Sequence, residues 1–218
     1  MKIPNYDSNT KNESNQYELH PFFGDKPIRM LLCGSSGSGK TNILMHIILS
    51  PLIYYDHIII YSKTIDQDKY KQIEEIFKKV MKDSNIKQPF WTFTNEAVKP
   101  HDTLDKVKRK IVIFDDLICT SKKELAIIQD YYILGRHFKI SPIFLTQSYY
   151  MLNKGIRINC SHFIIFRLNN KRETSSVLGD HPGVDLEMYN KATEGYDCLC
   201  INKLNKMIVK NLDENIEK

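Results

Sequence analysis

The sequence predicts an α/β fold, in which helices cover both faces of a mostly parallel sheet and a hairpin follows near the carboxyl end. Two observations support this prediction. Short, nearly uninterrupted apolar runs alternate with longer segments of helical periodicity, which is typical of parallel strands covered on both faces. A glycine-rich segment also separates the first apolar run from the first helical segment, as in strand–loop–helix units.

The elements are expected in the following order. Six apolar runs predict the strands of the sheet: Ile28–Cys33, His57–Ser62, Phe90–Phe93, Lys110–Asp115, Pro142–Gln147 and His162–Leu168. Helical patterns predict helices at 40–49, 66–82 and 121–138, followed by two shorter helices over Asn170–Leu178 and Val184–Thr193. The closing hairpin is expected to pair two segments across a turn at Lys203–Asn205, and these segments are Tyr196–Ile201 and Lys206–Asn211.

The composition is that of an ordinary globular chain. Of the 218 residues, 42% are hydrophobic and 26% are charged, so one domain over 21–218 is expected, preceded by a polar, loose arm at 1–20. The net charge of +5 is compatible with nucleic acid and equally with a solvated lysine-rich surface. The polar N-terminus and the lack of a long apolar run predict neither a signal peptide nor a membrane span.

The five cysteines are odd in number and show no C-x-x-C spacing. This pattern predicts free thiols in a reducing compartment rather than a disulfide framework or a zinc site. Cys33 and Cys119 flank apolar runs and are expected to be buried. Cys198 and Cys200 are expected on one face of a strand.

The glycine-rich segment satisfies the phosphate-binding pattern G-x-x-x-x-G-K-[ST] with the residues Gly34, Ser35, Ser36, Gly37, Ser38, Gly39, Lys40 and Thr41. Its glycines let successive backbone N–H groups turn toward phosphate oxygens, and the helix N-terminus adds partial positive charge. Lys40 is expected to reach the β- and γ-phosphates, and the Thr41 hydroxyl to hold Mg²⁺. We therefore expect a P-loop NTPase that binds ATP or a related nucleotide with Mg²⁺.

A second apolar run ends in two carboxylates, Asp115 and Asp116. Asp115 is expected to hold Mg²⁺ through its water shell. Asp116 is expected to orient the attacking water, the alternatives being a helix N-cap or a hydrogen bond to a Mg²⁺ ligand. The long interval between Lys40 and Asp115 suits NTPases with a strand inserted between the two motifs. If the run that ends in Gln147 is that strand, its amide reaches the γ-phosphate; otherwise Gln147 simply caps a strand end.

The order of GSSGSGKT, IVIFDDL and LGRHFKISPIFLTQSYYMLNKGIRINCSHFIIFRL resembles the poxvirus-type DNA-packaging ATPases of nucleocytoplasmic large DNA viruses, within the FtsK/HerA superfamily, over about 28–170. The resemblance implies a three-layer P-loop sandwich of the additional-strand (RecA- or FtsK/HerA-like) type. It also implies a homo-oligomeric ring, a pentamer or hexamer, that hydrolyses ATP to pump double-stranded DNA into a viral capsid through capsid or portal components. The expected location is the host cytoplasm, at a viral factory, or the virion. Asp116 departs from the pattern of that superfamily, in which Glu is common at the corresponding position.

The resemblance further implies that an arginine from one subunit completes the site of the next. Arg136 is the favoured candidate and Arg157 the second, the alternative for both being a surface or phosphate-binding arginine. Contacts to DNA phosphates are expected from the basic segments 106–110 or 121–123, the alternative being solvated loops.

Three aromatic residues precede the first predicted strand and are candidates to stack on the nucleotide base: Tyr17, Phe22 and Phe23. The alternative is that they anchor the N-terminal arm to the core.

Three rival interpretations remain at this stage. A nucleotide kinase needs an arginine-rich lid, and this chain is short of arginine where a lid would fall. A non-catalytic P-loop scaffold has no use for water-orienting groups such as Asp116 and Gln147. A HerA-like DNA helicase or translocase shares the physics of translocation, and the sequence does not separate it from a packaging motor.

Overall fold

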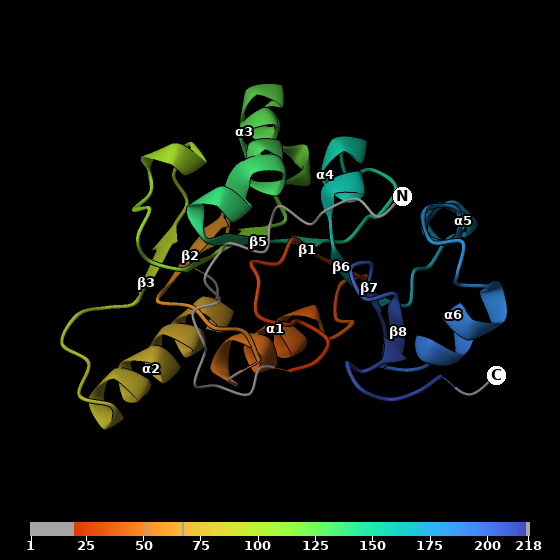
Figure 1. Ribbon diagram of the computed structural model, residues 1–218, viewed down its shortest axis with the longest axis horizontal. Helices are drawn as coiled ribbons and strands as arrows, with labels where there is room; N and C mark the ends of the chain where they lie inside the picture. Colours follow the sequence, from red (N-terminus) through yellow and green to blue (C-terminus); the bar gives the residue numbers. More distant parts are fainter. Residues whose placement is uncertain (1–19, 51, 67, 217–218) are drawn as a thin grey trace, which may run out of the picture.

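The computed structural model describes residues 20–50, 52–66 and 68–216. Within these residues one eight-stranded sheet has the order β3-β2-β4-β5-β1-β6-β7-β8 (Figure 1). The strands β1 to β6 are parallel, and β7 and β8 run antiparallel to their neighbours. Their bounds are β1 Met30–Cys33, β2 His57–Ser62, β3 Trp91–Thr94, β4 Lys110–Asp115, β5 Ile140–Thr146, β6 His162–Phe166, β7 Cys198–Asn202 and β8 Met207–Lys210.

Helices cover both faces of the sheet, as predicted. Figure 1 shows α1 (Lys40–Leu49) and α2 (Asp68–Asp83) on one face, and α3 (Lys122–Leu134) and α4 (Lys154–Asn159) on the other. The helices α5 (Lys171–Asp180) and α6 (Leu186–Ala192) lie near the β7–β8 hairpin. The short 3₁₀ turns are η2 His101–Thr103, η3 Leu117–Cys119 and η4 Gly135–Phe138. The predicted α/β three-layer sandwich is confirmed.

Strand β1 shows why its sequence is apolar throughout. Successive side chains of a strand point to opposite faces. Met30 and Leu32 pack in the apolar cluster that contains the buried residues of α1 and α2. Leu31 and Cys33 pack in the cluster that contains those of α3. All four side chains are fully buried. The strand therefore lies between two apolar layers and needs no polar face.

Strand β5 is the inserted strand that the spacing of the motifs predicts. It pairs with β1 on one side, Met30 opposite Ile143, and with β4 on the other, Ile113 opposite the same Ile143. Because all three strands are parallel, their carboxyl ends meet at one edge of the sheet. The P-loop follows β1, Asp115 ends β4 and Gln147 follows β5, so this edge carries every motif predicted to bind phosphate.

Three elements, β2, β4 and α1, have the predicted bounds, and the others differ at their ends for visible reasons. β1 begins at Met30, two residues later than predicted, because the N–H groups of Ile28 and Arg29 donate to the hydroxyls of Ser141 and Ser161 instead of to a neighbouring strand. β6 ends two residues early, since the N–H of the second following residue donates to the hydroxyl of Tyr189. The predicted helix 121–138 ends at residue 134 and tightens into η4.

Two questions about single residues are answered by the structure: the expected burial of Cys119 is wrong, and the anchoring of Phe22 and Phe23 is confirmed. Cys119 is exposed, because it ends the η3 turn at the surface, whereas Cys33 is buried as predicted. Phe22 and Phe23 do not face the P-loop. Both are buried in aromatic contact with His162, at the amino end of β6, so the anchoring alternative holds for them. Tyr17 and the arm predicted for 1–20 lie, apart from residue 20, outside the described residues.

The other predictions place two cysteines on one face of a strand and expect no membrane span. Cys198 and Cys200 are both buried on β7, with their sulfur atoms 3.7 Å apart. The short helix α4 was not predicted; the Asn153 side chain caps its first turn by accepting from the Gly155 N–H at 2.7 Å. Among the described residues, no helix has the length and apolar character needed to cross a membrane.

Candidate nucleotide-binding site

The P-loop folds tightly over Phe166 of β6. Gly37 and Gly39 have φ of 74° and 101°, in the left-handed region that favours glycine. A side chain at Gly34 would place its Cβ 2.7 Å from the Phe166 Cβ, closer than real Cβ contacts. The Gly34 N–H donates to the Thr146 carbonyl at 3.2 Å, which ties the loop to the end of β5. The glycines therefore serve both loop curvature and close packing.

The P-loop holds donors suited to an anion. The Lys40 ammonium donates to the carbonyl oxygens of Gly34 and Ser35 at 2.6 and 2.7 Å, and partial burial lowers the pKa of Lys40. The Ser38 hydroxyl is buried without a hydrogen-bond partner among the described residues. Buried polar atoms normally have a partner. The Lys40 ammonium, at the N-terminus of α1, is the kind of donor that a polyphosphate binds.

Asp115 ends β4 with its side chain only 11% exposed. The Lys69 ammonium lies 2.9 Å from its Oδ2, and the Tyr70 hydroxyl donates to the same oxygen. Burial and the adjacent Asp115 carboxylate raise the pKa of Tyr70 well above its ordinary value, so the phenol keeps its proton and remains a donor. The carboxylate is thus oriented by two groups from the start of α2.

Asp116 and Gln147 face each other across the end of the sheet. Asp116 is exposed and has φ 55° and ψ 37°. Its N–H donates to the Leu145 carbonyl at 3.0 Å, while its side chain makes no capping bond to η3. The Gln147 Nε2 donates to the Asp116 Oδ2 at 3.4 Å. The carboxylate therefore faces the amide and the cavity rather than the turn that follows it.

One cavity of about 270 Å³ collects the groups that the sequence singles out. Its lining includes Lys40, Thr41, Asp115, Asp116 and Gln147. The Thr41 hydroxyl and the Asp115 carboxylate are oxygen ligands of the kind that Mg²⁺ prefers. These residues fit a magnesium-bound triphosphate: donors lie along the P-loop, and carboxylates lie at the end where a γ-phosphate would be placed.

Lys69 and Tyr70 contact Asp115 and were not among the site residues predicted from the sequence, and Lys69 lines the same cavity. A signal for them existed. β2 is parallel to β4 and directly beside it, so the segment that follows β2 returns past the end of β4. A lysine and a tyrosine in the first turn of the next helix are therefore placed to reach Asp115.

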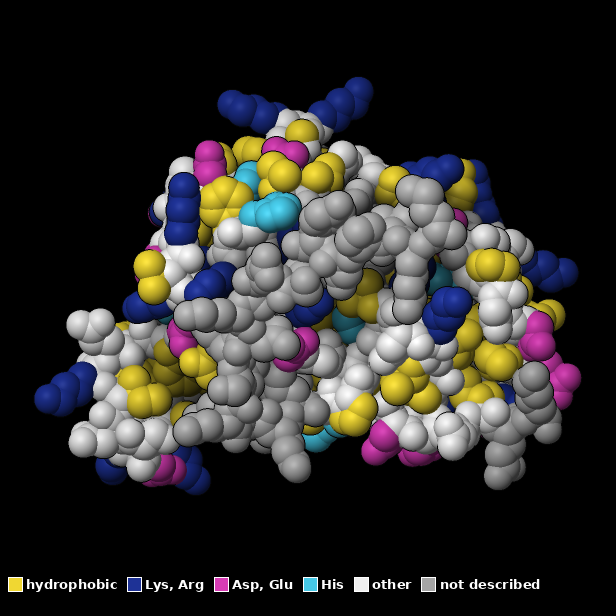
Figure 2. Space-filling model, in the orientation of Figure 1, with side chains coloured by type: hydrophobic (Ala, Val, Ile, Leu, Met, Phe, Trp, Pro, Cys, Tyr) yellow, Lys and Arg dark blue, Asp and Glu magenta, His cyan; other side chains and the backbone are white. Residues whose placement is uncertain are grey.

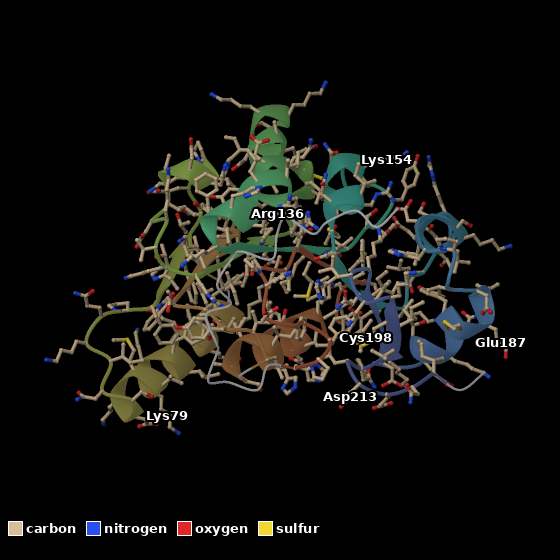
Figure 3. The ribbon with its side chains drawn as sticks, in the orientation of Figure 1. Lys79, Arg136, Lys154, Glu187, Cys198 and Asp213 are labelled. Atoms are coloured by element: carbon tan, nitrogen blue, oxygen red, sulfur yellow. The ribbon has the colours of Figure 1, made fainter. Side chains whose placement is uncertain are left out.

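The two predicted arginines do not lie in this cavity. Arg136 is exposed on η4, before the amino end of β5 and hence at the sheet edge opposite the P-loop; Figure 3 shows it on the α3 side of the sheet. Arg157 on α4 pairs with Asp180 at 3.0 Å and lies 5.0 Å from the Tyr149 ring centroid. Within one chain, neither guanidinium completes the site.

Comparison with known proteins agrees with this geometry. The family model described as Poxvirus A32 protein matches residues 20–178. The DNA packaging protein OPG160 of variola virus is 28% identical over 155 residues, covering 66% of this chain and 54% of that protein. OPG160 of vaccinia virus (strain Copenhagen) gives the same identity and coverage. The chain thus spans about half the length of the curated relatives it matches.

Among solved structures, the genome packaging NTPase B204 of Sulfolobus turreted icosahedral virus 2, in complex with AMP, has a similar fold. Its TM-score is 0.62 at 16% identity, covering 84% of this chain and 96% of B204. The cavity joins the P-loop to Asp115 and Asp116. The family model matches most of the chain, and the chain therefore belongs to the Poxvirus A32 protein family.

Proposed function

We propose that this chain is the ATPase of a viral genome-packaging motor, which hydrolyses ATP to translocate double-stranded DNA into a capsid. The observation that carries the proposal is the convergence of Lys40, Thr41, Asp115, Asp116 and Gln147 on one cavity. Membership in the Poxvirus A32 protein family supports it, as does the similarity to a DNA packaging protein of variola virus.

In this proposal the P-loop binds the phosphates of ATP. The Lys40 ammonium exchanges its carbonyl partners, Gly34 and Ser35, for β- and γ-phosphate oxygens. Thr41 and Asp115 would hold Mg²⁺, which neutralises charge on the β- and γ-phosphates when bound. Lys69, whose side chain is 33% exposed and ends 2.9 Å from Asp115, adds a second ammonium beside the γ-phosphate.

Hydrolysis needs a water molecule in line with the γ-phosphate and an acceptor for its proton. Asp116 supplies the acceptor, because its carboxylate lines the cavity and is not used as a helix cap. The Gln147 amide, 3.4 Å from that carboxylate, fixes its direction and is placed to sense the γ-phosphate. A positioned acid–base group of this kind contributes about 10²- to 10⁴-fold in rate.

The proposal also requires neighbouring subunits. A guanidinium beside the γ-phosphate accelerates related reactions by about 10³- to 10⁵-fold. Within the chain, Arg157 is held by Asp180, whereas Arg136 is exposed. We therefore keep Arg136 as the residue offered to the next subunit of a homo-oligomeric ring and assign Arg157 to holding α4 against α5 through the Asp180 pair.

DNA contacts are proposed at the start of α3. Lys122 and Lys123 are exposed there and follow Asp116 through the short turn η3. Figure 2 shows basic side chains projecting beyond the outer end of α3. The other basic segment, 106–110, precedes β4 at the opposite edge of the sheet, and its Lys110 is buried, donating to the Asp105 and Lys108 carbonyls.

Phosphate release measured with and without duplex DNA tests the proposal. Wild-type protein is expected to hydrolyse ATP faster with DNA, and Lys40→Ala and Asp115→Ala to lose turnover with either. Lys79→Ala removes an exposed lysine of α2 far from the cavity (Figure 3). It is the matched control and is expected to retain turnover. Transfer of phosphate to a nucleoside monophosphate, with no DNA effect, would identify a kinase instead.

The same preparation gives a test of how DNA is held. Lysine contacts to the phosphate backbone release counterions, so affinity is expected to fall steeply as salt rises and to differ little between unrelated duplex sequences. Double replacement of Lys122 and Lys123 by Ala is expected to flatten the salt dependence. A flat salt response of the wild type, or strong base preference, would contradict this assignment.

A further inference from the structure

A second hollow lies against the P-loop, outside the cavity described above. Its volume is about 240 Å³, and it is formed by residues 37–42 together with Tyr196. Gly37, Lys40 and Thr41 line both hollows, so the P-loop runs between them. Asp115, Asp116 and Gln147 line the first hollow and not the second.

This arrangement fixes the direction of a bound nucleotide. The carboxylates and the amide mark the end where the γ-phosphate lies, since they serve hydrolysis. A triphosphate that follows the P-loop away from them carries its α-phosphate, ribose and base toward the second hollow. The group that meets the base is therefore expected among residues 37–42 and Tyr196.

Tyr196 has the properties of a stacking platform. It is 81% exposed, more than any other tyrosine among the described residues. Its neighbours hold it in place: the Asp197 N–H donates to the Glu194 carbonyl at 3.0 Å, and Gly195 between them has φ 60°. The Asp197 carboxylate also pairs with Lys210 of β8 at 2.6 Å. An exposed aromatic ring on an anchored turn can stack on a planar ring system such as a nucleobase.

The fold brings this turn to the P-loop. Cys198, two residues after Tyr196 and labelled in Figure 3, pairs with Phe166 across β7 and β6. Phe166 is the residue over which the P-loop packs, with its ring 3.4 Å from where a Cβ of Gly39 would lie. The Tyr196 turn and the first turn of α1 are therefore neighbours at the same sheet edge, although they are far apart in sequence.

We propose that Tyr196 stacks on the base of the bound nucleoside triphosphate, a role that the sequence had suggested for Phe22 and Phe23. This rests on the proposed nucleotide binding at the P-loop. Every base presents a π-face, so stacking selects for ring area rather than for the identity of one base. Asn42 carries the amide of the hollow, which offers both a donor and an acceptor to a base edge. Purine nucleotides are therefore preferred, with adenine and guanine bound within a few-fold of each other.

Calorimetric titration separates base from phosphate. ATP and inorganic tripolyphosphate, each with Mg²⁺, are titrated into wild type, Tyr196→Ala and Tyr196→Phe. Tyr196→Ala is expected to weaken ATP binding by about tenfold, equivalent to ~1.4 kcal/mol, and to leave tripolyphosphate unchanged. Tyr196→Phe keeps the ring and is expected to retain ATP affinity. Tyr150→Ala, which removes a half-exposed tyrosine outside both hollows, is the matched control and is expected to change neither.

The outcomes are distinguishable. Unchanged ATP affinity in Tyr196→Ala, or an equal loss of tripolyphosphate, would overturn the base site. A change in oligomer mass for Tyr196→Ala without a change in ATP affinity would assign the ring to subunit contact and overturn it as well. Normal ATP binding without DNA-stimulated hydrolysis would defeat the proposed packaging function, while the base site would stand on the tripolyphosphate comparison.

Discussion

Replacement of Asp116 by Asn separates the chemistry of its carboxylate from the backbone conformation that it occupies. The residue has φ 55° and ψ 37°, in the left-handed region. Most L-residues incur roughly 1–2 kcal/mol there, whereas Asn and Asp are accommodated through their short polar side chains. Asn also retains an oxygen that can accept the 3.4 Å hydrogen bond from Gln147. Asp116→Asn is therefore expected to change the free energy of unfolding by less than about 0.5 kcal/mol.

The effect on turnover is expected to be far larger. A neutral amide cannot accept a proton from the attacking water, so hydrolysis should fall by about 10²- to 10⁴-fold. Asp116→Glu keeps the carboxylate but places a longer side chain at the same left-handed position, and it should lower the free energy of unfolding by roughly 1 kcal/mol. This cost gives a physical reason for the chain to carry Asp rather than Glu at a position with left-handed backbone geometry.

Two measurements check the reasoning. Urea denaturation gives the free energy of unfolding for wild type, Asp116→Asn and Asp116→Glu. Single-turnover phosphate release, with ATP and Mg²⁺ in the assembled protein, gives the rate of the chemical step. Wild-type rates in Asp116→Asn would refute the role of the carboxylate. A loss of stability in Asp116→Asn as large as that in Asp116→Glu would refute the backbone argument.

Three further predictions concern packing, subunit contact and pH. Gly34→Ala places a Cβ 2.7 Å from that of Phe166 and should lower the free energy of unfolding by about 1–3 kcal/mol, whereas Gly179→Ala, with open space around it, should not. Arg136→Ala should abolish turnover in assembled rings while ATP binding persists; near-normal turnover would reject it as the trans residue. Burial lowers the pKa of His162 from 6.5 to about 4. The contribution of the neutral imidazole to the free energy of unfolding is therefore fully present above pH 6.5 and is lost as pH falls through about 4. The total loss is about 3 kcal/mol. Denaturation curves of wild type and His162→Gln between pH 7 and 4 check this, and parallel pH profiles would contradict it.

Much of the site could be predicted because its parts are fixed by local sequence and by one rule of parallel sheets. The P-loop needs its glycines, lysine and threonine in order, and a strand must precede it. Asp115 ends an apolar strand, and parallel strands bring their carboxyl ends to one edge. The spacing of the motifs predicted an inserted strand, with the run ending in Gln147 as the candidate, and the structure places that strand, β5, between β1 and β4. The contact of Gln147 with Asp116 was seen only in the structure.

What could not be predicted depends on contacts between segments that are distant in sequence. Phe22 is buried with its ring against His162, which lies 140 residues away and also hydrogen-bonds the Phe22 carbonyl. Nothing near Phe22 distinguishes such an anchor from an aromatic that faces a nucleotide. Tyr196 is the converse, since only the pairing of β7 with β6 brings its turn beside the P-loop. Lys69 likewise required the order of β2 and β4 before its contact with Asp115 could be seen.

Strand displacement from a DNA triplex tests the central claim, that hydrolysis at the P-loop cavity moves duplex DNA. A third strand is annealed to a long duplex, and its release is followed with ATP and Mg²⁺ present. Wild-type protein is expected to release the third strand at a rate that rises with ATP, and Lys40→Ala is expected to release none. Release that is equally fast in Lys40→Ala, or DNA-stimulated hydrolysis by wild type without any release, would contradict the claim.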